Sequence, residues 1–293
     1  MTNETDKKLT FNERLMSIDR RWVFLVLAIF VVVPLILGFS VKPVVSDEVR
    51  AIYDFVENLE PGQNLLVAID YDPNALAELH PMAFAIMEQA LAKRLKLVTL
   101  TLSQNGAGMA EQAVKAVVDS VKMYHGYTPE YGKDYVFLGY RPYFALVILG
   151  MGQNFRIPFP KDYYSTPLDS MPIMAKIQNY DQIAGVIDIT GSNVADAWIA
   201  YGNGRYGVKV ALGLTGVSAS DYYPFYQSKQ IIGLMGGMKG AAEYEFLCKN
   251  PGPATEAMGV QTFAHIVIIG FIVIGNIGYF LDKREKAKRK KEM

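Results

Sequence analysis

The sequence predicts an α/β protein: a Rossmann-like three-layer domain with a mostly parallel sheet, flanked by one transmembrane helix at each end. Two observations predict this fold class. Uncharged runs of membrane-spanning length occupy residues 22–41 and 257–281 of the 293-residue chain. Between them, short apolar runs alternate with helix-length segments, which is typical of parallel strands that are buried on both faces and joined by right-handed crossovers.

The run at 22–41 has 20 uncharged residues, which at a rise of about 1.5 Å per residue match the roughly 30 Å hydrocarbon core of a bilayer. Trp22 stands at its edge, where an interfacial anchor belongs. The run at 257–281 is long enough to span with some tilt. We therefore expect two membrane helices and the lipid bilayer as a partner. A cleaved signal peptide, with Gly38-Phe39-Ser40 as a poor cleavage site, is the alternative for the first run.

Basic residues flank both runs on their outer sides. The tail 1–21 carries five Lys or Arg residues and the tail 282–293 carries seven. The positive-inside rule then predicts a double-pass protein of the cell membrane with both termini cytoplasmic and residues 42–256 extracytoplasmic. This central segment has 17 basic and 22 acidic residues, a balance that disfavours nucleic acid as its partner.

The elements of the central domain follow from periodicity and from turn residues. A helix should begin at Ser46-Asp47 and end before Pro61-Gly62. Strands are expected at residues 65–70, 97–102, 135–140, 184–190 and 208–214, and helices from the first strand to about Arg94 and at 107–124, 193–202 and 221–248. The apolar segment 144–151 fits either a sixth strand or a short buried helix. The first and fourth strands share an apolar run that leads into Ile-Asp ahead of a turn-to-helix junction, so a duplication of two half-domains is a further hypothesis.

Ligands bind α/β sheets of this kind outside the carboxyl ends of the strands, and polar side chains follow several of the predicted strands. These candidate ligand-binding residues are acidic or hydroxylated: Asp70, Asp72, Ser103, Asp188, Thr190, Ser192 and Thr215. Asp188 lies between two isoleucines, so we expect it to be buried and to need hydrogen-bond donors, from a ligand or from loop backbone. In the second case Ser192 would cap the following helix.

Two interpretations of Asp70-Tyr71-Asp72 stay open. The spacing resembles the D-x-D start of haloacid-dehalogenase-type phosphotransferases, which implies a carboxylate nucleophile, a second carboxylate as acid or base, and magnesium. The next residues, Pro73-Asn74, depart from that pattern. They fit a helix start, in which Asp72 accepts from free backbone N–H groups and Pro73 occupies the first helical position.

Several kinds of site lack their residues in this sequence. One cysteine excludes a disulfide framework and multi-cysteine metal sites, and the three histidines have no ligand spacing. No G-x-G-x-x-G follows the first strand, so no dinucleotide is expected. Nothing resembles a complete Ser-His-Asp set. We therefore predict no cofactor and no resident metal.

The last predicted helix is rich in glycine, and each glycine in a helix interior costs about 0.8–1 kcal/mol relative to alanine. Small residues four apart would let a second backbone approach closely, from the domain's own sheet or from another subunit. On the second interpretation the chain forms a homo-oligomer or joins a partner membrane protein, with an interface at Gly233, Gly236, Gly237, Gly240 and Ala241.

Together these features favour a binding, sensing or scaffold subunit of a membrane complex over an enzyme. The alternative is a metal-assisted hydrolase or phosphatase that uses Asp70, Asp72 and Asp188. It requires these three carboxylates to converge on one divalent ion.

Overall fold

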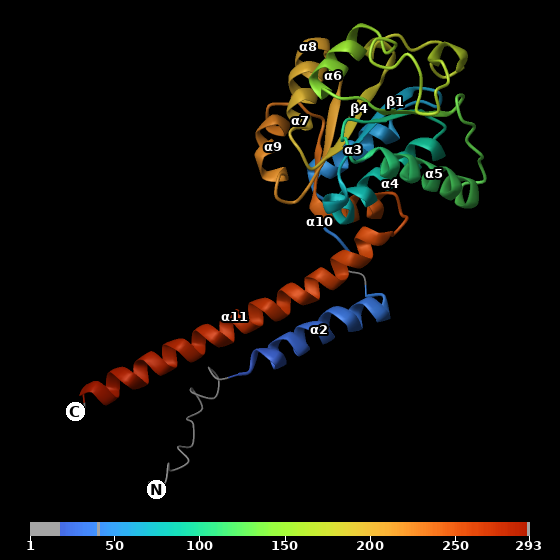
Figure 1. The fold of residues 1–293 in the computed structure, drawn as a ribbon. Helices are drawn as coiled ribbons and strands as arrows, with labels where there is room; N and C mark the ends of the chain where they lie inside the picture. The colour runs from blue at the N-terminus through green and yellow to red at the C-terminus, as the bar shows by residue number, and fades with distance from the viewer. Residues whose placement is uncertain (1–17, 40–41, 292–293) are drawn as a thin grey trace. The chain divides into compact units, whose positions relative to one another are not determined.

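The computed structural model describes residues 18–39 and 42–291, without the side chains of residues 285 and 288–291 (Figure 1). Most of the expected tail 1–21 and the end of the run 22–41 therefore lie outside the described residues. The chain divides into two units, Lys42–Thr255 and the terminal helices on either side of it.

The terminal unit contains α2 (Arg20–Leu37) and most of α11 (Pro253–Lys291). Both helices are long and apolar enough to cross a membrane, as judged by length and composition. The α2 helix begins where the Asp19 carboxylate accepts a hydrogen bond from the backbone N–H of Arg21. It ends at Gly38, whose φ of 64° is the left-handed conformation that closes many helices.

The central unit is built on a six-stranded, all-parallel sheet with the order β3-β2-β1-β4-β5-β6. Its strands are β1 (Asn64–Asp70), β2 (Lys96–Thr101), β3 (Tyr135–Tyr140), β4 (Gly185–Thr190), β5 (Val210–Leu214) and β6 (Leu234–Gly236). The Rossmann-like α/β prediction is confirmed, because this is the strand order of doubly wound dinucleotide-binding sheets. The order divides the sheet into two halves that meet at β1 and β4.

Helices cover both faces of the sheet, which explains why its strands are apolar almost throughout (Figure 1). One face carries α3 (Asp47–Glu57), α4 (Leu76–Ala92), α5 (Ala107–Tyr124) and α10 (Gly237–Leu247). The other face carries α6 (Phe144–Gln153), α7 (Val194–Ala197), the π-helical turn η4 (Trp198–Asn203), α8 (Gly204–Tyr206) and α9 (Ala219–Gln227). Short 3-10 turns η1 (Pro73–Ala75), η2 (Leu168–Ser170) and η3 (Tyr180–Gln182) complete the unit.

Two expectations about elements are resolved by the structure. The segment 144–151 belongs to a helix, α6, and not to a strand. The single helix expected over 221–248 is wrong: α9 ends at Gln227, the chain then adds the three-residue edge strand β6, and α10 begins only at Gly237. Edge pairing of Leu234–Gly236 with β5 supplies backbone hydrogen bonds without the cost of several glycines in a helix interior.

The five predicted small residues therefore do not share one helical face: Gly233 and Gly236 lie before α10, and the other three lie within it. All five contact their own domain. A Cβ on Gly233 would lie 2.2 Å from the carbonyl oxygen of Glu48, and one on Gly236 would lie 2.8 Å from the Cβ of Ala219. Gly237 has a φ of 59°. A Cβ on Gly240 would meet the backbone of Met235 at 3.0 Å, and Ala241 is fully buried. Each of the five therefore has contacts inside its own domain, while an interface between subunits stays a prediction.

The first turn of α11 is held by a buried carboxylate of α10. Glu245 accepts hydrogen bonds from the backbone N–H groups of Gly252 (3.0 Å), Ala254 (3.1 Å) and Thr255 (2.8 Å), and from the Thr255 hydroxyl (2.6 Å). These N–H groups have no partner within the helix, and an anion at a helix N-terminus also interacts favourably with its dipole. The start of α11 is therefore part of the α/β unit.

Candidate functional site

A cleft lies outside the carboxyl ends of the strands, where the strand order reverses between β1 and β4. Its volume is about 560 Å³, and loops that follow β1, β2, β4 and β5 line it. This is the position at which doubly wound sheets bind their ligands. Five of the seven predicted ligand-binding residues line the cleft: Asp70, Asp72, Ser103, Ser192 and Thr215.

On one side of the cleft, Asp72 contacts the loop after β2. The Ser103 hydroxyl donates a hydrogen bond to the Asp72 carboxylate. Pro73 occupies the first position of η1, as expected, but the Asp72 side chain accepts no capping hydrogen bond from that turn. The helix-capping interpretation of Asp72 is therefore wrong, because its carboxylate links two loops at the cleft wall.

On the other side, the hydroxyl residues hold the shape of their own loops. The Thr190 hydroxyl contacts the carbonyl oxygen of Asp70 at 3.1 Å and the Ser192 hydroxyl at 3.0 Å. The Val194 N–H approaches the Ser192 hydroxyl at only 3.5 Å, so Ser192 is a weak cap of α7. Thr215 and Ser218 share a hydroxyl contact of 2.9 Å after β5. These side chains fix the loops and leave a polar wall.

Beneath the cleft, the carboxyls of Asp70 and Asp188 meet. Asp188 is in register with Ala68, and Asp70 with Thr190, so the two acids project from neighbouring strands onto the same face of the sheet. They are 2% and 0% exposed. One oxygen of Asp70 accepts from the backbone N–H of Leu102. Asp70 Oδ2 and both Asp188 oxygens receive no N–H or hydroxyl donor among the described residues. Asp188 is buried as predicted, but the expected loop donors are absent from the described part of the chain.

The burial of the two acids controls their protonation. Burial raises the pKa of Asp70 to about 7, although the Leu102 N–H and weaker interactions with Asp188, Thr101 and Trp198 limit the rise. Burial, and then the negative charge of Asp70, raise the pKa of Asp188 well above its ordinary value. The pair therefore shares a proton, which is held by Asp188 and donated to Asp70.

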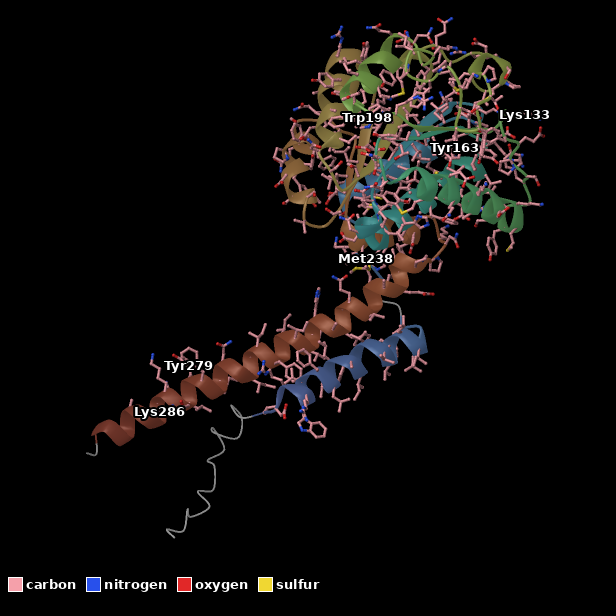
Figure 2. The ribbon with its side chains drawn as sticks, viewed as in Figure 1. Lys133, Tyr163, Trp198, Met238, Tyr279 and Lys286 are labelled. Atoms are coloured by element: carbon pink, nitrogen blue, oxygen red, sulfur yellow. The ribbon has the colours of Figure 1, made fainter. Side chains whose placement is uncertain are left out.

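Trp198 completes the surroundings of this pair. It is fully buried within the α/β unit (Figure 2). Its indole Nε1 makes no hydrogen bond of normal geometry among the described residues, yet it lies near enough to Asp70 to favour the charged form of that carboxyl. The indole N–H therefore makes no hydrogen bond to the pair, but its proximity favours the charged form of Asp70.

The charged residues that line the cleft are all acidic: Asp70, Asp72 and Glu78. Glu78 accepts a hydrogen bond of 2.7 Å from the backbone N–H of Gly216. No Lys, Arg or His is among the lining residues. The electrostatic character of the cleft is therefore negative, which disfavours anionic ligands such as phosphates.

The described residues form neither a glycine-rich dinucleotide loop after β1 nor the three-carboxylate metal site that the alternative function requires. The first strand-to-helix turn is Tyr71-Asp72-Pro73 instead of a glycine loop, and the buried Tyr71 side chain fills space there. Within residues 18–39 and 42–291, no three His, Cys, Asp or Glu side chains are placed to hold a metal. Asp70 and Asp188 converge, but Asp72 is engaged by Ser103 instead.

Several residues of the site were not predicted, among them Glu78, Phe144, Val217 and Trp198. Glu78 could have been inferred from the sequence, because an acidic residue in the first turn of a helix that follows a strand lies near the same sheet edge. Phe144, Val217 and Trp198 could not have been inferred, because their places depend on how α6, the β5–α9 loop and η4 pack over the sheet.

Comparisons of the chain with protein-family models, with curated proteins and with solved structures find no match. The function must therefore be inferred from the site itself.

Proposed function

We propose that this protein is a membrane-anchored binding or sensing subunit whose α/β domain takes a small polar ligand in the cleft between β1 and β4. The observation that carries the proposal is the cleft itself. Its volume of about 560 Å³ falls within the range of small-molecule sites. It lies at the switch point of a doubly wound sheet and combines polar walls with a few apolar contacts.

The setting of this domain completes the proposal. The helices α2 and α11 cross the cell membrane, and their basic flanks keep both termini in the cytoplasm and the α/β domain outside. Their exposed apolar side chains contact lipid and the helices of a partner membrane protein or of a second copy of this chain. Such an arrangement suits an external ligand sensor or a scaffold subunit of a membrane complex.

The alternative, a metal-assisted hydrolase or phosphatase that uses Asp70, Asp72 and Asp188, has less support. It needs three carboxylates around one ion, and the described residues contain no such group. A binding function needs only the polar cleft.

The test is to identify what the cleft retains. The full chain is purified in nanodiscs, and its co-purified small molecules are released and identified by native mass spectrometry. Replacing the exposed cleft residue Asn193 with tryptophan fills the cleft and should abolish the bound species. Lys122→Trp, on the exposed side of α5, is the matched control and should keep it. Equal retention by both variants would contradict the proposal.

A further inference from the structure

We propose that the ligand of this cleft carries a protonated amine, and that its binding displaces a proton from the Asp70–Asp188 pair. This inference rests on the proposed function, because it uses the same cleft. It adds the chemical class of the ligand and couples binding to proton release.

The first argument is the charge of the walls. Asp72 and Glu78 line the cleft with Asp70, and no basic side chain lines it. None of the ion pairs among the described residues includes Asp70, Asp72, Glu78 or Asp188. A cationic ligand would provide the counter-charge that this chain does not place there.

The second argument is a surplus of buried acceptors at the floor. Asp70 lines the cleft although it is only 2% exposed, and its Oδ2 has no N–H or hydroxyl donor among the described residues. Both Asp188 oxygens are also buried and have no N–H or hydroxyl donor among the described residues. One proton shared by Asp188 and Asp70 forms a hydrogen bond between two of these three oxygens, so the third still has no donor. An ammonium group brings three N–H donors and no acceptor, so it complements this floor.

The groups that interact with the pair include no cation. They are the Thr101 hydroxyl of β2, the Leu102 N–H just after it, the indole of Trp198 from η4, and Tyr222 of α9, whose hydroxyl interacts with Asp196 of α7. The charge of the pair therefore depends on protons or on a ligand.

The proton balance follows from these surroundings. Burial raises the pKa of Asp70 to about 7, so near neutral pH doubly and singly protonated pairs are both populated. An ammonium group at the floor stabilises the singly protonated, negatively charged pair. The second proton then leaves to water: one carboxyl O–H bond breaks, its electron pair stays on the carboxylate oxygen, and no bond to the ligand's heavy atoms forms. Near neutral pH binding should therefore release protons, and the number released should fall as the pH rises.

The apolar part of the cleft fits the carbon part of such a ligand. Phe144 lines the cleft and presents an aromatic ring, with which a cation can also interact favourably. Val217, also in the lining, is 88% exposed. An organic cation uses both, whereas a bare metal ion would use neither and lacks a group of three ligands among the described residues.

The experiment is isothermal titration calorimetry of the full chain in nanodiscs with methylamine, putrescine and spermidine. Running each titration at pH 7 in two buffers of different ionisation enthalpy counts the protons released. The comparison ligands are 1,4-butanediol, which is a neutral analogue of putrescine, the anion succinate, and CaCl₂. We expect at least one amine to bind with proton release, and no binding of the diol, succinate or calcium.

Isosteric variants locate the interaction. The amides introduced by Asp72→Asn and Glu78→Gln retain a carbonyl oxygen that can accept from Ser103 and Gly216, so both variants should keep the fold. Each should weaken amine binding by about tenfold. Asp70→Asn keeps an acceptor for the Leu102 N–H but removes the carboxyl that loses the proton, so it should abolish proton release and the rise of affinity between pH 6 and 8. Asp188→Asn keeps the donor of the protonated acid and should retain proton release. Glu130→Gln, at an exposed acid outside the cleft, should change neither. Unchanged circular dichroism verifies folding.

Several results would overturn the inference. Equal binding of 1,4-butanediol would show that the cleft takes neutral ligands, which would leave the proposed function intact. Calcium binding that Asp72→Asn abolishes would identify a metal site. Binding of none of the three amines at 10 mM would reject the amine class, while a co-purified neutral molecule would still support the cleft as a ligand site.

Discussion

Asp188 has the environment of a neutral carboxylic acid, and Asp70 has that of its hydrogen-bond acceptor. Asp70 receives the Leu102 N–H and lies near Thr101 and Trp198, all of which favour its charged form. Asp188 is fully buried, and its protonation is governed by burial and by the charge of Asp70. The proton therefore belongs to Asp188, and an asparagine there reproduces the shape and donor of the protonated acid.

This assignment predicts how stability depends on pH. The folded-state pKa values of both acids lie above their unfolded values near 4, so between pH 4 and about 7 the folded protein binds more protons than the unfolded chain. The pair's contribution to stability is then largest at low pH and is lost as pH rises through 7. We expect Asp188→Asn to lose less stability than the natural chain between pH 5 and 8.

The measurement is the thermal midpoint of the full chain in detergent at pH 5 and pH 8, with Glu130→Gln as a control for removing an exposed acid. Other titrating groups affect all three proteins alike, so the difference between Asp188→Asn and the control isolates the pair. Identical pH profiles for the two variants would mean that Asp188 holds no proton in the folded state.

Among the elements, those with a long and regular apolar pattern were predictable from sequence. The first five strands are apolar at nearly every position because helices cover both faces, and α5 follows its 3.6-residue period from Ala107 to Tyr124. The strand β6 was missed because three residues at a sheet edge are too short to produce a pattern. The glycines around β6 are three or four residues apart, and this spacing is also compatible with a helix.

The candidate site was predictable only in part, for a related reason. Polar residues after strands point to the sheet edge, and this rule located Asp70, Asp72 and Ser103. The contact between Asp70 and Asp188 depends on β1 and β4 being neighbours, which is a property of the strand order and not of either segment. The sequence alone leaves a helix cap open as the role of Asp72, because its actual hydroxyl donor, Ser103, comes from another loop.

Gly233 provides a prediction at the scale of elements, because it lies where the chain before β6 passes α3. A Cβ there would meet the Glu48 carbonyl oxygen at 2.2 Å and the Ile52 side chain at 2.9 Å. Gly233→Ala must therefore displace α3 or β6, and we expect it to destabilise the domain by about 1–3 kcal/mol. Gly108→Ala, in α5 with nothing within 4 Å of the added atom, is the matched control.

Chemical denaturation followed by circular dichroism measures both variants. The control should lose no stability, because alanine favours a helix over glycine by about 0.5–1 kcal/mol. If Gly233→Ala left stability unchanged but altered the size of the detergent-solubilised particle, the residue would belong to an interface between subunits. The internal role assigned to this glycine would then be wrong.

At the scale of the whole molecule, the charges and the apolar helices predict one topology. Two helices are long and apolar enough to cross a membrane. A basic tail precedes the first apolar run, another follows the second, and the segment between the two runs is acidic. Moving the basic tails across a bilayer is unfavourable and the acidic segment carries no comparable cluster, so the charges favour external placement of residues 42–256.

Protease protection tests this topology. In sealed, right-side-out cells, added protease should cleave residues 42–256 and spare epitope tags at both termini; after permeabilisation it should remove all three. The well-packed α/β unit can resist cleavage, so a protease site inserted beside Gly126, an exposed turn after α5, ensures that the domain is cut when accessible. A matched site placed after residue 287, in the basic tail, should stay uncut until the cells are opened. Cleavage of the tail site in sealed cells, with the Gly126 site protected, would require the opposite orientation. The cleft would then lie in the cytoplasm, where a proton-coupled sensor of external amines could not act.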